Sequence, residues 1–273
     1  MIKFENIEVM GWEHAIRGMR NPMNSWEKSD SGICKGGDDG IGCENCANYD
    51  SCEHTYDHSW QLGKADRDLM MRLAAGGPVH AKYRRMITVY VDITAPLYWW
   101  KEFDTYKVGT VANSCSTMHK IAEKEFAPED FSCEHLIDSF GEIWDIAAGD
   151  ECRSTPLDIL YTVINALNIY REKYIETKDK KYWWQMIQLL PSSYNQKRTV
   201  MLNYEVLANI YKSRRNHKLD EWAEHDTKLP SKLIQACNDA LINIGEGGNH
   251  MFGFCDWIKT LPYSELITGN KGK

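Results

Sequence analysis

The fold is decided by residues 87–120, which read ITVYVDITAPLYWWKEFDTYKVGTVANSCSTMHK. From residue 86 to residue 93, β-branched apolar side chains alternate with polar ones. An alternation of period two predicts a β-strand with one buried face. Pro96 follows the strand. The aromatic residues of the run 98–103 then predict a helix or turn that packs beneath a site, because aromatic side chains dominate core burial.

Helical patterns surround this stretch. Spacing and length predict helices at residues 62–75, 136–148, 157–175, 182–190, 196–216 and 231–244. Gly76 closes the first helix, and Thr155 with Pro156 opens the third, since proline fits the first helical position. Residues 2–9 add a short strand. Many helices around few strands predict an α+β fold, a small, mainly antiparallel sheet with several surrounding helices.

Length and composition bound the class of protein. With 273 residues and 43% hydrophobic content the chain can bury a core, and we expect a single domain over residues 1–273. A formal charge of -7 and a pI near 5.7 argue against duplex nucleic acid as a partner but allow a local cationic pocket for a phosphate. Residues 1–18 carry early charges and no apolar segment, so we expect no secretory signal and no membrane anchor. Nine cysteines in a chain without an export signal favour reduced thiols or metal ligands over a disulfide framework, and we expect a cytoplasmic protein.

Residues 21–56 are rich in Cys, Gly and Asp and predict a long loop inserted into the domain. Four thiols in it follow the spacing C-x8-C-x2-C-x5-C, namely Cys34, Cys43, Cys46 and Cys52. A metal would give such a loop the core that it lacks, with zinc as the first choice and an iron–sulfur cluster as the rival. His54 or His58 could replace one thiolate. Reduced free thiols are the alternative.

A second stretch, residues 190–222, reads LPSSYNQKRTVMLNYEVLANIYKSRRNHKLDEW. With residues 87–120 it resembles the flavin-dependent thymidylate synthases. That family has a Leu-Pro step, an Asn twelve residues later that opens a long helix, and an Arg eleven residues further on. Pro191, Asn203 and Arg214 keep these steps.

The first stretch resembles the family with altered charges. The family's Arg-His-Arg triplet falls on Thr105, Tyr106 and Lys107, so only the last cation is kept. The family's next turn, with Asn-Glu, Ser and Arg-Tyr, matches Asn113–Ser114, Ser116 and Met118–His119 after a one-residue insertion. Two further arginines of the family are Ile187 and Glu205 here.

The resemblance implies a homotetramer with active sites between subunits, FAD as the hydride carrier and a dUMP-like pyrimidine nucleotide as the acceptor. Arg214 would orient the base, and Ser116 with turn amides would bind the phosphate; both are the candidate catalytic residues. Candidate flavin-binding residues are Lys107, Asn113, Asn203 and Asn209. Candidate substrate-binding residues are Ser116, His119, Lys120, Arg198 and Arg214, where the other cations replace those that are missing.

Each of these residues also has a structural interpretation. Arg214 could belong to a solvated, ion-paired helix face, Ser116 could end a turn, and Asn203 and Asn209 could be helix surface. Three functions therefore stay open. The first is an FAD-dependent, thymidylate synthase-like methyltransferase. The second is a non-catalytic or re-specialised nucleotide-binding relative, and the third is a metal-stapled interaction protein.

Overall fold

The computed structural model describes residues 2–34, 43, 45–49, 52, 59–138, 143–144, 153–225 and 252–269. The chain divides into two compact units. Unit 1 comprises Met1–Glu5, Asp92–Thr105 and Ala112–Val200, and unit 2 comprises Asn6–Val91, Tyr106–Val111 and Met201–Lys273. The expectation of a single domain stays a prediction.

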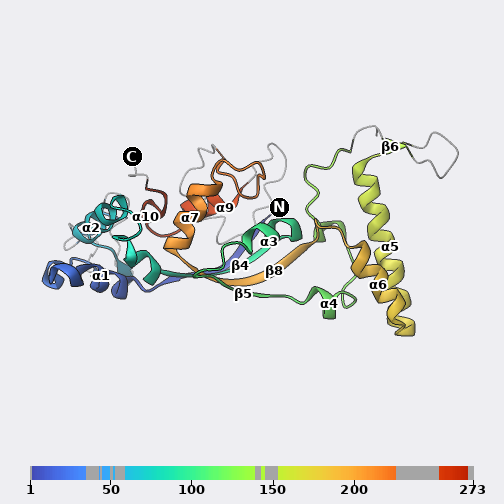
Figure 1. Cartoon of the computed structure of the whole chain (residues 1–273), viewed down its shortest axis with the longest axis horizontal. Helices are drawn as coiled ribbons and strands as arrows, with labels where there is room; N and C mark the ends of the chain where they lie inside the picture. Colours follow the sequence, from blue (N-terminus) through green and yellow to red (C-terminus); the bar gives the residue numbers. More distant parts are fainter. Residues whose placement is uncertain are drawn as a thin grey trace. The chain divides into compact units, whose positions relative to one another are not determined.

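The main sheet has four strands in the order β1-β4-β8-β5 (Figure 1). Their bounds are Lys3–Met10 for β1, Thr88–Pro96 for β4, Asn195–Asn203 for β8 and Val111–Ser114 for β5. In β4, Val89, Val91, Ile93 and Ala95 are buried at every second position, as the alternation predicts. Two short antiparallel pairs join β2 (Gly32–Ile33) to β3 (Trp60–Gln61) and β6 (Ile143–Trp144) to β7 (Arg153–Ser154). The predicted fold class, α+β with a small antiparallel sheet and several helices, is confirmed.

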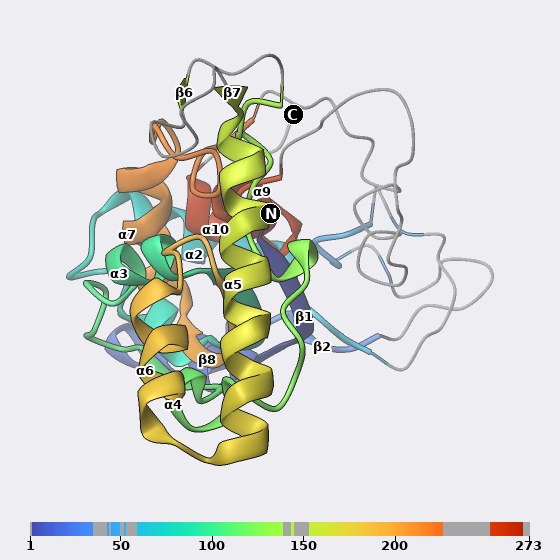
Figure 2. The same ribbon diagram turned by 90° about the vertical axis from the view of Figure 1, so that its right-hand side faces the viewer.

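A helical hairpin organises unit 1. In Figure 2, α5 (Pro156–Thr177) and α6 (Lys180–Leu189) run side by side. Their buried faces share one apolar cluster, which contains Ile121, Phe126, Phe131, Leu160, Ile164, Leu167 and Met186. The Thr155 side chain accepts the amide of Asp158 and caps α5. The short helices of this unit are α3 (Leu97–Phe103), α4 (Thr117–Lys120) and η4 (Pro128–Asp130).

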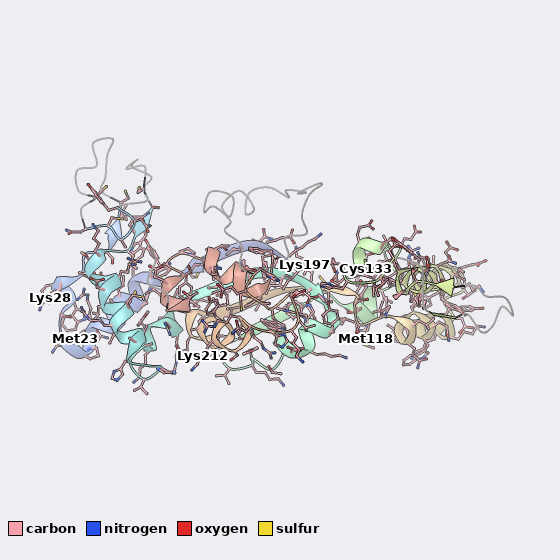
Figure 3. All side chains as sticks on the ribbon, turned by 90° about the horizontal axis from the view of Figure 1, so that it is seen from above. Met23, Lys28, Met118, Cys133, Lys197 and Lys212 are labelled. Carbon is pink, nitrogen blue, oxygen red and sulfur yellow. The ribbon has the colours of Figure 1, made fainter. Side chains whose placement is uncertain are left out.

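The predicted aromatic run lies on α3. Trp99, Trp100 and Phe103 are buried, with ring centroids 4.9 to 5.2 Å apart. The Trp100 indole donates to the carbonyl of Gln196 at 2.9 Å, which ties α3 to β8. These rings therefore form core, as expected. Met118 on α4, labelled in Figure 3, is by contrast exposed.

Unit 2 contains helices from both the N-terminal and the C-terminal parts of the chain. Its helices are α1 (Trp12–Arg20), η1 (Asn21–Met23), η2 (Trp26–Lys28), α2 (Lys64–Ala75), η3 (Lys82–Met86), α7 (Tyr204–Arg214), α9 (Phe254–Thr260) and α10 (Glu265–Thr268). Helix α7 packs against η3, α9 and α10. Trp222, Phe254 and Trp257 are buried beside it, with neighbouring ring centroids 5.0 to 5.4 Å apart. Among the residues that the structure describes, no helix is long and apolar enough to cross a membrane.

Two helix predictions are wrong. Residues 196–216 do not form one helix, because Asn195–Asn203 is strand β8 and the helix begins only at Tyr204. Pairing in the sheet and the cap at Asn203 override the helical pattern. In 136–148, the described residues 136–138 are not helical and Ile143–Trp144 pairs as a strand. The predicted helix 231–244 lies outside the described residues.

Candidate functional site

Arg214 is held at the C-terminal end of α7, within unit 2. Its Nε–H donates to the Tyr106 hydroxyl at 2.9 Å, and Nη1 lies 2.7 Å from Nε2 of His217. The guanidinium carbon lies 5.2 Å from the ring centroid of the buried Trp222 and 5.7 Å from that of Tyr106. The guanidinium is therefore half-buried and fixed beside two aromatic rings, an arrangement that keeps its plane and its charge in place.

This contact brings two predicted parts of the site together. Tyr106 is the middle residue of the segment that replaces the family's Arg-His-Arg triplet, and Lys107 follows it. The hydrogen bond to Arg214 therefore places Tyr106 at the end of α7. Lys107 is exposed, so its ammonium group is accessible to solvent. Asn209 is also exposed, about 1.4 turns before Arg214 on α7.

Asn203 caps α7. Its Oδ1 accepts the amides of Glu205 and Val206, both at 3.1 Å. The cap satisfies two of the amides that a helix start leaves without partners. Gly109 lies close to this cap, because a Cβ on it would stand 3.0 Å from Nδ2 of Asn203. Asn203 therefore has a structural role as the cap of α7, and its role in flavin binding stays a prediction.

In unit 1, one side-chain network links the turn after β5 to β8. Nε2 of Gln196 donates to the Cys115 carbonyl at 3.0 Å and to Oγ1 of Thr117 at 2.8 Å, while its Oε1 accepts from Nε of Arg198 at 3.0 Å. Ser116 stands between the two acceptors of this turn and caps α4 by accepting the amide of His119 at 3.1 Å. The turn that carries Ser116 is therefore tied to Arg198, one of the predicted replacement cations.

Arg198 is the most constrained of these cations. Its Nη1 lies 2.8 Å from Oδ1 of Asp104, and its guanidinium carbon lies 4.2 Å from the ring centroid of buried Trp100. Lys120 forms an ion pair with Glu123, and both side chains are exposed. Asn113 and His119 are exposed as well. The structure thus gives Arg198 a fixed position and leaves the other side chains at the surface.

The predicted residues divide between the two units. Unit 2 holds Lys107, Asn203, Asn209 and Arg214, and unit 1 holds Asn113, Ser116, His119, Lys120 and Arg198. The sequence missed several of the residues that position them, namely Asp104, Gln196, His217 and Trp222. Two positioning residues carried a signal: Trp100 lies in the aromatic run 98–103, and Tyr106 lies within the triplet segment.

Glu205, which replaces an arginine of the family, is buried in the first turn of α7. Its Oε2 has no hydrogen-bond donor among the described residues. The pKa of the neighbouring Tyr83 is raised to about 12, chiefly by burial; the charge of Arg84 opposes the shift and that of Glu205 adds to it. Glu205 therefore lies in the interior of unit 2, near Tyr83 and Arg84.

The predicted metal site is not supported. All four cysteines of the loop lie among the described residues, which contain no group of three or more His, Cys, Asp or Glu side chains arranged to hold a metal. Cys43 is buried, and Cys52 is exposed. Local backbone bonds such as Cys46 N–H to the Cys43 carbonyl, 2.8 Å, shape this segment. His54 and His58 lie outside the described residues.

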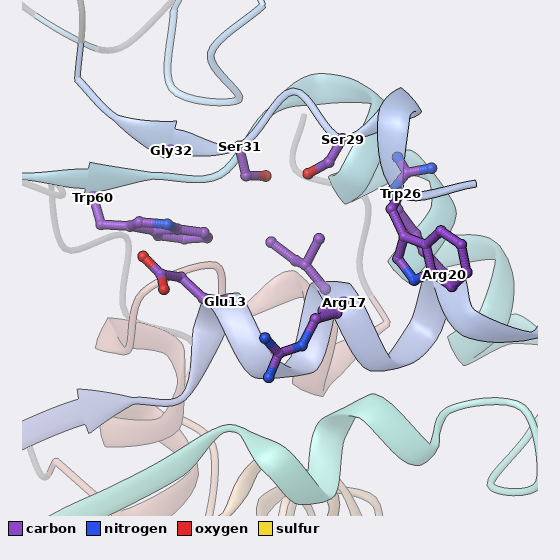
Figure 4. Close-up of a pocket in the computed structure, with 9 residues that line it drawn as sticks. Glu13, Arg17, Arg20, Trp26, Ser29, Ser31, Gly32 and Trp60 are labelled. Carbon is purple, nitrogen blue, oxygen red and sulfur yellow. The ribbon is translucent and has the colours of Figure 1, made fainter. Parts of the chain in front are cut away.

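A cavity of about 300 Å³ lies along α1 (Figure 4). Glu13 extends from α1 toward Trp60, and Arg17 lies one turn further along the same helix. At its wall the buried Arg20 donates from Nε to Asp66 at 2.6 Å. Burial alone would raise the pKa of Asp66, but hydrogen bonds from Ser31, Ser29 and Arg20 and the charge of Arg20 outweigh burial and lower it. This network joins α1, the segment after η2 and α2 into one structure.

Comparison with known proteins places the fold. No family model matches the sequence, and no curated protein matches it. Two structures of the flavin-dependent thymidylate synthase X of Helicobacter pylori with FAD and dUMP are similar at 14% identity over 98% of each chain, with TM-scores of 0.52 and 0.50. A UMP/dUMP methylase from Streptomyces cacaoi bound with 5-Br dUMP gives a TM-score of 0.47 at 14% identity, over 98% of this chain and 95% of that one. This chain has the fold of the flavin-dependent thymidylate synthases.

Proposed function

We propose that this protein binds a dUMP-like pyrimidine nucleotide together with FAD and acts as a divergent, thymidylate synthase-like methyltransferase. The fold supports the proposal, since solved structures of the same fold contain FAD and dUMP. The observation that carries it is Arg214. This residue keeps the family's register and is fixed by Tyr106, His217 and Trp222 rather than turned into solvent.

The residues around Arg214 fit a planar, anionic ligand. A fixed guanidinium donates to carbonyl oxygens, and negative charge that develops on a pyrimidine ring is stabilised by a cation held in advance. Lys107, next to Tyr106 in the chain, and Asn209, five positions before Arg214 on α7, are exposed and so available to a flavin phosphate and a polar ring edge. FAD, when bound, supplies the hydride.

The Ser116 turn fits a phosphate. The Ser116 oxygen accepts the His119 amide, so its own O–H stays available to donate to a phosphate oxygen. Arg198, held through Gln196, adds a cation fixed to the same turn. We further propose that the protein is a cytoplasmic homotetramer and that both groups of residues serve active sites formed between subunits.

The purified protein tests this proposal directly. We expect flavin absorbance in the protein as isolated or after addition of FAD, and oxidation of the reduced flavin that depends on dUMP. Arg214→Lys should weaken dUMP binding about tenfold, which corresponds to one lost charge-assisted hydrogen bond. Arg215→Lys, on the exposed neighbouring residue, is the matched control and should change nothing. A colourless protein that ignores both FAD and dUMP would contradict the proposal.

The altered cations favour a second function, that of a non-catalytic or re-specialised nucleotide-binding relative. Thr105 and Tyr106 replace two cations of the triplet, and Glu205 places a buried carboxylate where the family has an arginine. Flavin affinity can be lost while nucleotide binding remains. For a protein of this second kind we expect thermal stabilisation by dUMP without any response to FAD. At a hundred times its dissociation constant, dUMP would add about 2.7 kcal/mol to the free energy of unfolding.

A further inference from the structure

A second cavity in unit 2, of about 690 Å³, is lined mainly by α2. The lining residues of α2 recur at intervals of three and four positions, so they share one face of the helix. With one residue of η3 and the residue after α10, the lining comprises Arg67, Asp68, Met71, Arg72, Ala74, Ala75, Arg84 and Gly269. None of these residues belongs to the proposed flavin and nucleotide site.

The lining of the cavity is rich in arginine although the protein is acidic. Its lining carries three arginines and one carboxylate, in a chain of formal charge -7. Arg67 is oriented by Glu265, whose Oε1 lies 2.5 Å from its Nε. Arg72 is exposed in the last turn of α2, where the partial negative charge of the helix end favours a cation.

Arg84 gives the second observation. It lies in η3, is only partly exposed, and its Nε–H is buried without an acceptor in the part of the chain that the structure describes. Buried donors nearly always have acceptors, and a buried donor of an arginine costs more to leave unpaired than a neutral one. The neighbouring Tyr83 hydroxyl donates to the Met70 carbonyl at 2.9 Å and fixes η3 against α2. Arg84 is thus held in the wall of the cavity, next to a tyrosine that fixes its helix.

We propose that this cavity binds the diphosphate group of a small molecule. Guanidinium forks match the oxygens of phosphates, and three of them suit a ligand with more than one charged group. The volume lies within the range of small-molecule sites, so the cavity has room for a nucleoside diphosphate as well as for the free diphosphate. The binding is electrostatic and weakens as salt rises.

Calorimetry on the full chain tests the proposal, with inorganic pyrophosphate in one arm and ADP in the other. We expect pyrophosphate to bind, and Arg72→Gln and Arg84→Gln each to weaken it at least tenfold. Arg85→Gln is the matched control, because Arg85 is exposed, adjacent to Arg84 and outside the lining. If ADP binds more tightly than pyrophosphate, the ligand of the cavity is a nucleotide. If the two affinities are equal, the cavity recognises the diphosphate group alone.

A further variant keeps every arginine. Met71→Glu adds a carboxylate to the lining and should weaken pyrophosphate at least tenfold, while circular dichroism confirms folding. Affinity should be unchanged with FAD and dUMP present, since the two sites share no residue. The proposal is overturned if neither probe binds at millimolar concentration, if Arg85→Gln weakens binding as much as Arg84→Gln, or if FAD or dUMP displaces pyrophosphate.

Discussion

Arg214 donates its Nε–H to the hydroxyl of Tyr106, a residue 108 positions earlier in the chain. This bond joins the end of α7 to the segment before β5 and gives the predicted base-orienting cation a fixed geometry. Arg198 has the corresponding constraint in unit 1, where Asp104, Gln196 and the Trp100 ring hold it. The cations that the sequence singled out are therefore not equivalent, since these two are positioned and Lys120 is a surface ion pair.

Tyr106→Phe should remove the bond to Arg214 and keep the ring that lies beside the guanidinium. Because Arg214 is partly exposed, we expect a loss of only about 1 kcal/mol in unfolding free energy. The dissociation constant for dUMP should rise several-fold, as the guanidinium loses its orientation. Urea denaturation and calorimetry measure the two effects. Unchanged nucleotide affinity in a folded variant would show that Tyr106 does not position Arg214 for binding.

Asp66→Asn should be strongly destabilising. It removes the charged partner of Arg20, which is 4% exposed, and leaves that guanidinium buried without a counter-ion. Breaking a buried ion pair by removing one partner costs about 3 to 5 kcal/mol. Asp68→Asn, two positions along α2 on an exposed residue, should stay within about 0.5 kcal/mol of the native chain. Equal losses in the two variants would contradict the importance of the pair.

The lowered pKa of Asp66 predicts that the free energy of unfolding depends on pH. The folded pKa of Asp66 lies below the ordinary value of 3.8, so the folded state holds this proton less tightly than the unfolded state. Its contribution to stability is therefore complete above that ordinary value and is lost as the pH falls through the lower, folded pKa. The gap in unfolding free energy between the native chain and Asp66→Asn should narrow only below about pH 4. A gap that narrows between neutral pH and pH 5 would contradict this assignment.

Gly109→Ala and Gly77→Ala form a matched pair. Both glycines have positive φ, 77° and 91°, so alanine pays backbone strain at each, roughly 1 kcal/mol. At Gly109 the new Cβ would also meet Nδ2 of Asn203 at 3.0 Å and Cγ2 of Val206 at 3.2 Å, whereas at Gly77 nothing lies within 4 Å. Chemical denaturation should give a larger loss for Gly109→Ala. Equal losses would mean that the Asn203 cap adjusts without cost.

Thr155→Ala should weaken the start of α5. Its hydroxyl accepts the Asp158 amide at 3.1 Å, and the Asp158 carboxylate in turn accepts the Thr155 amide at 2.8 Å. Loss of such a cap costs about 0.5 to 2 kcal/mol. Thr162→Ala, on an exposed residue within the same helix, should be neutral or stabilising, because alanine is the better helix former. Thermal unfolding distinguishes the two variants.

Strong local sequence patterns correctly predicted two elements, strand β4 and the start of helix α5. Alternation of buried residues gave β4, and Thr155–Pro156 gave the start of α5. Motif register gave the fold and placed Asn203 at a helix start. The single helix predicted for 196–216 was wrong because β8 is stabilised by pairing with strands distant in sequence, which a local pattern does not contain. The cysteine spacing was compatible with a metal, but the described thiols are not arranged around one.

The sequence by itself determined the α+β class, the buried face of β4 and the cap of α5, because these depend on the periods and capping residues of short segments. Only the tertiary structure decided which side chains hold Arg214 and Arg198, that Glu205 is buried, and that Arg67, Arg72 and Arg84 line one cavity. These relationships join residues tens of positions apart. Their distances are set by how helices and strands pack, and no spacing along the chain encodes them.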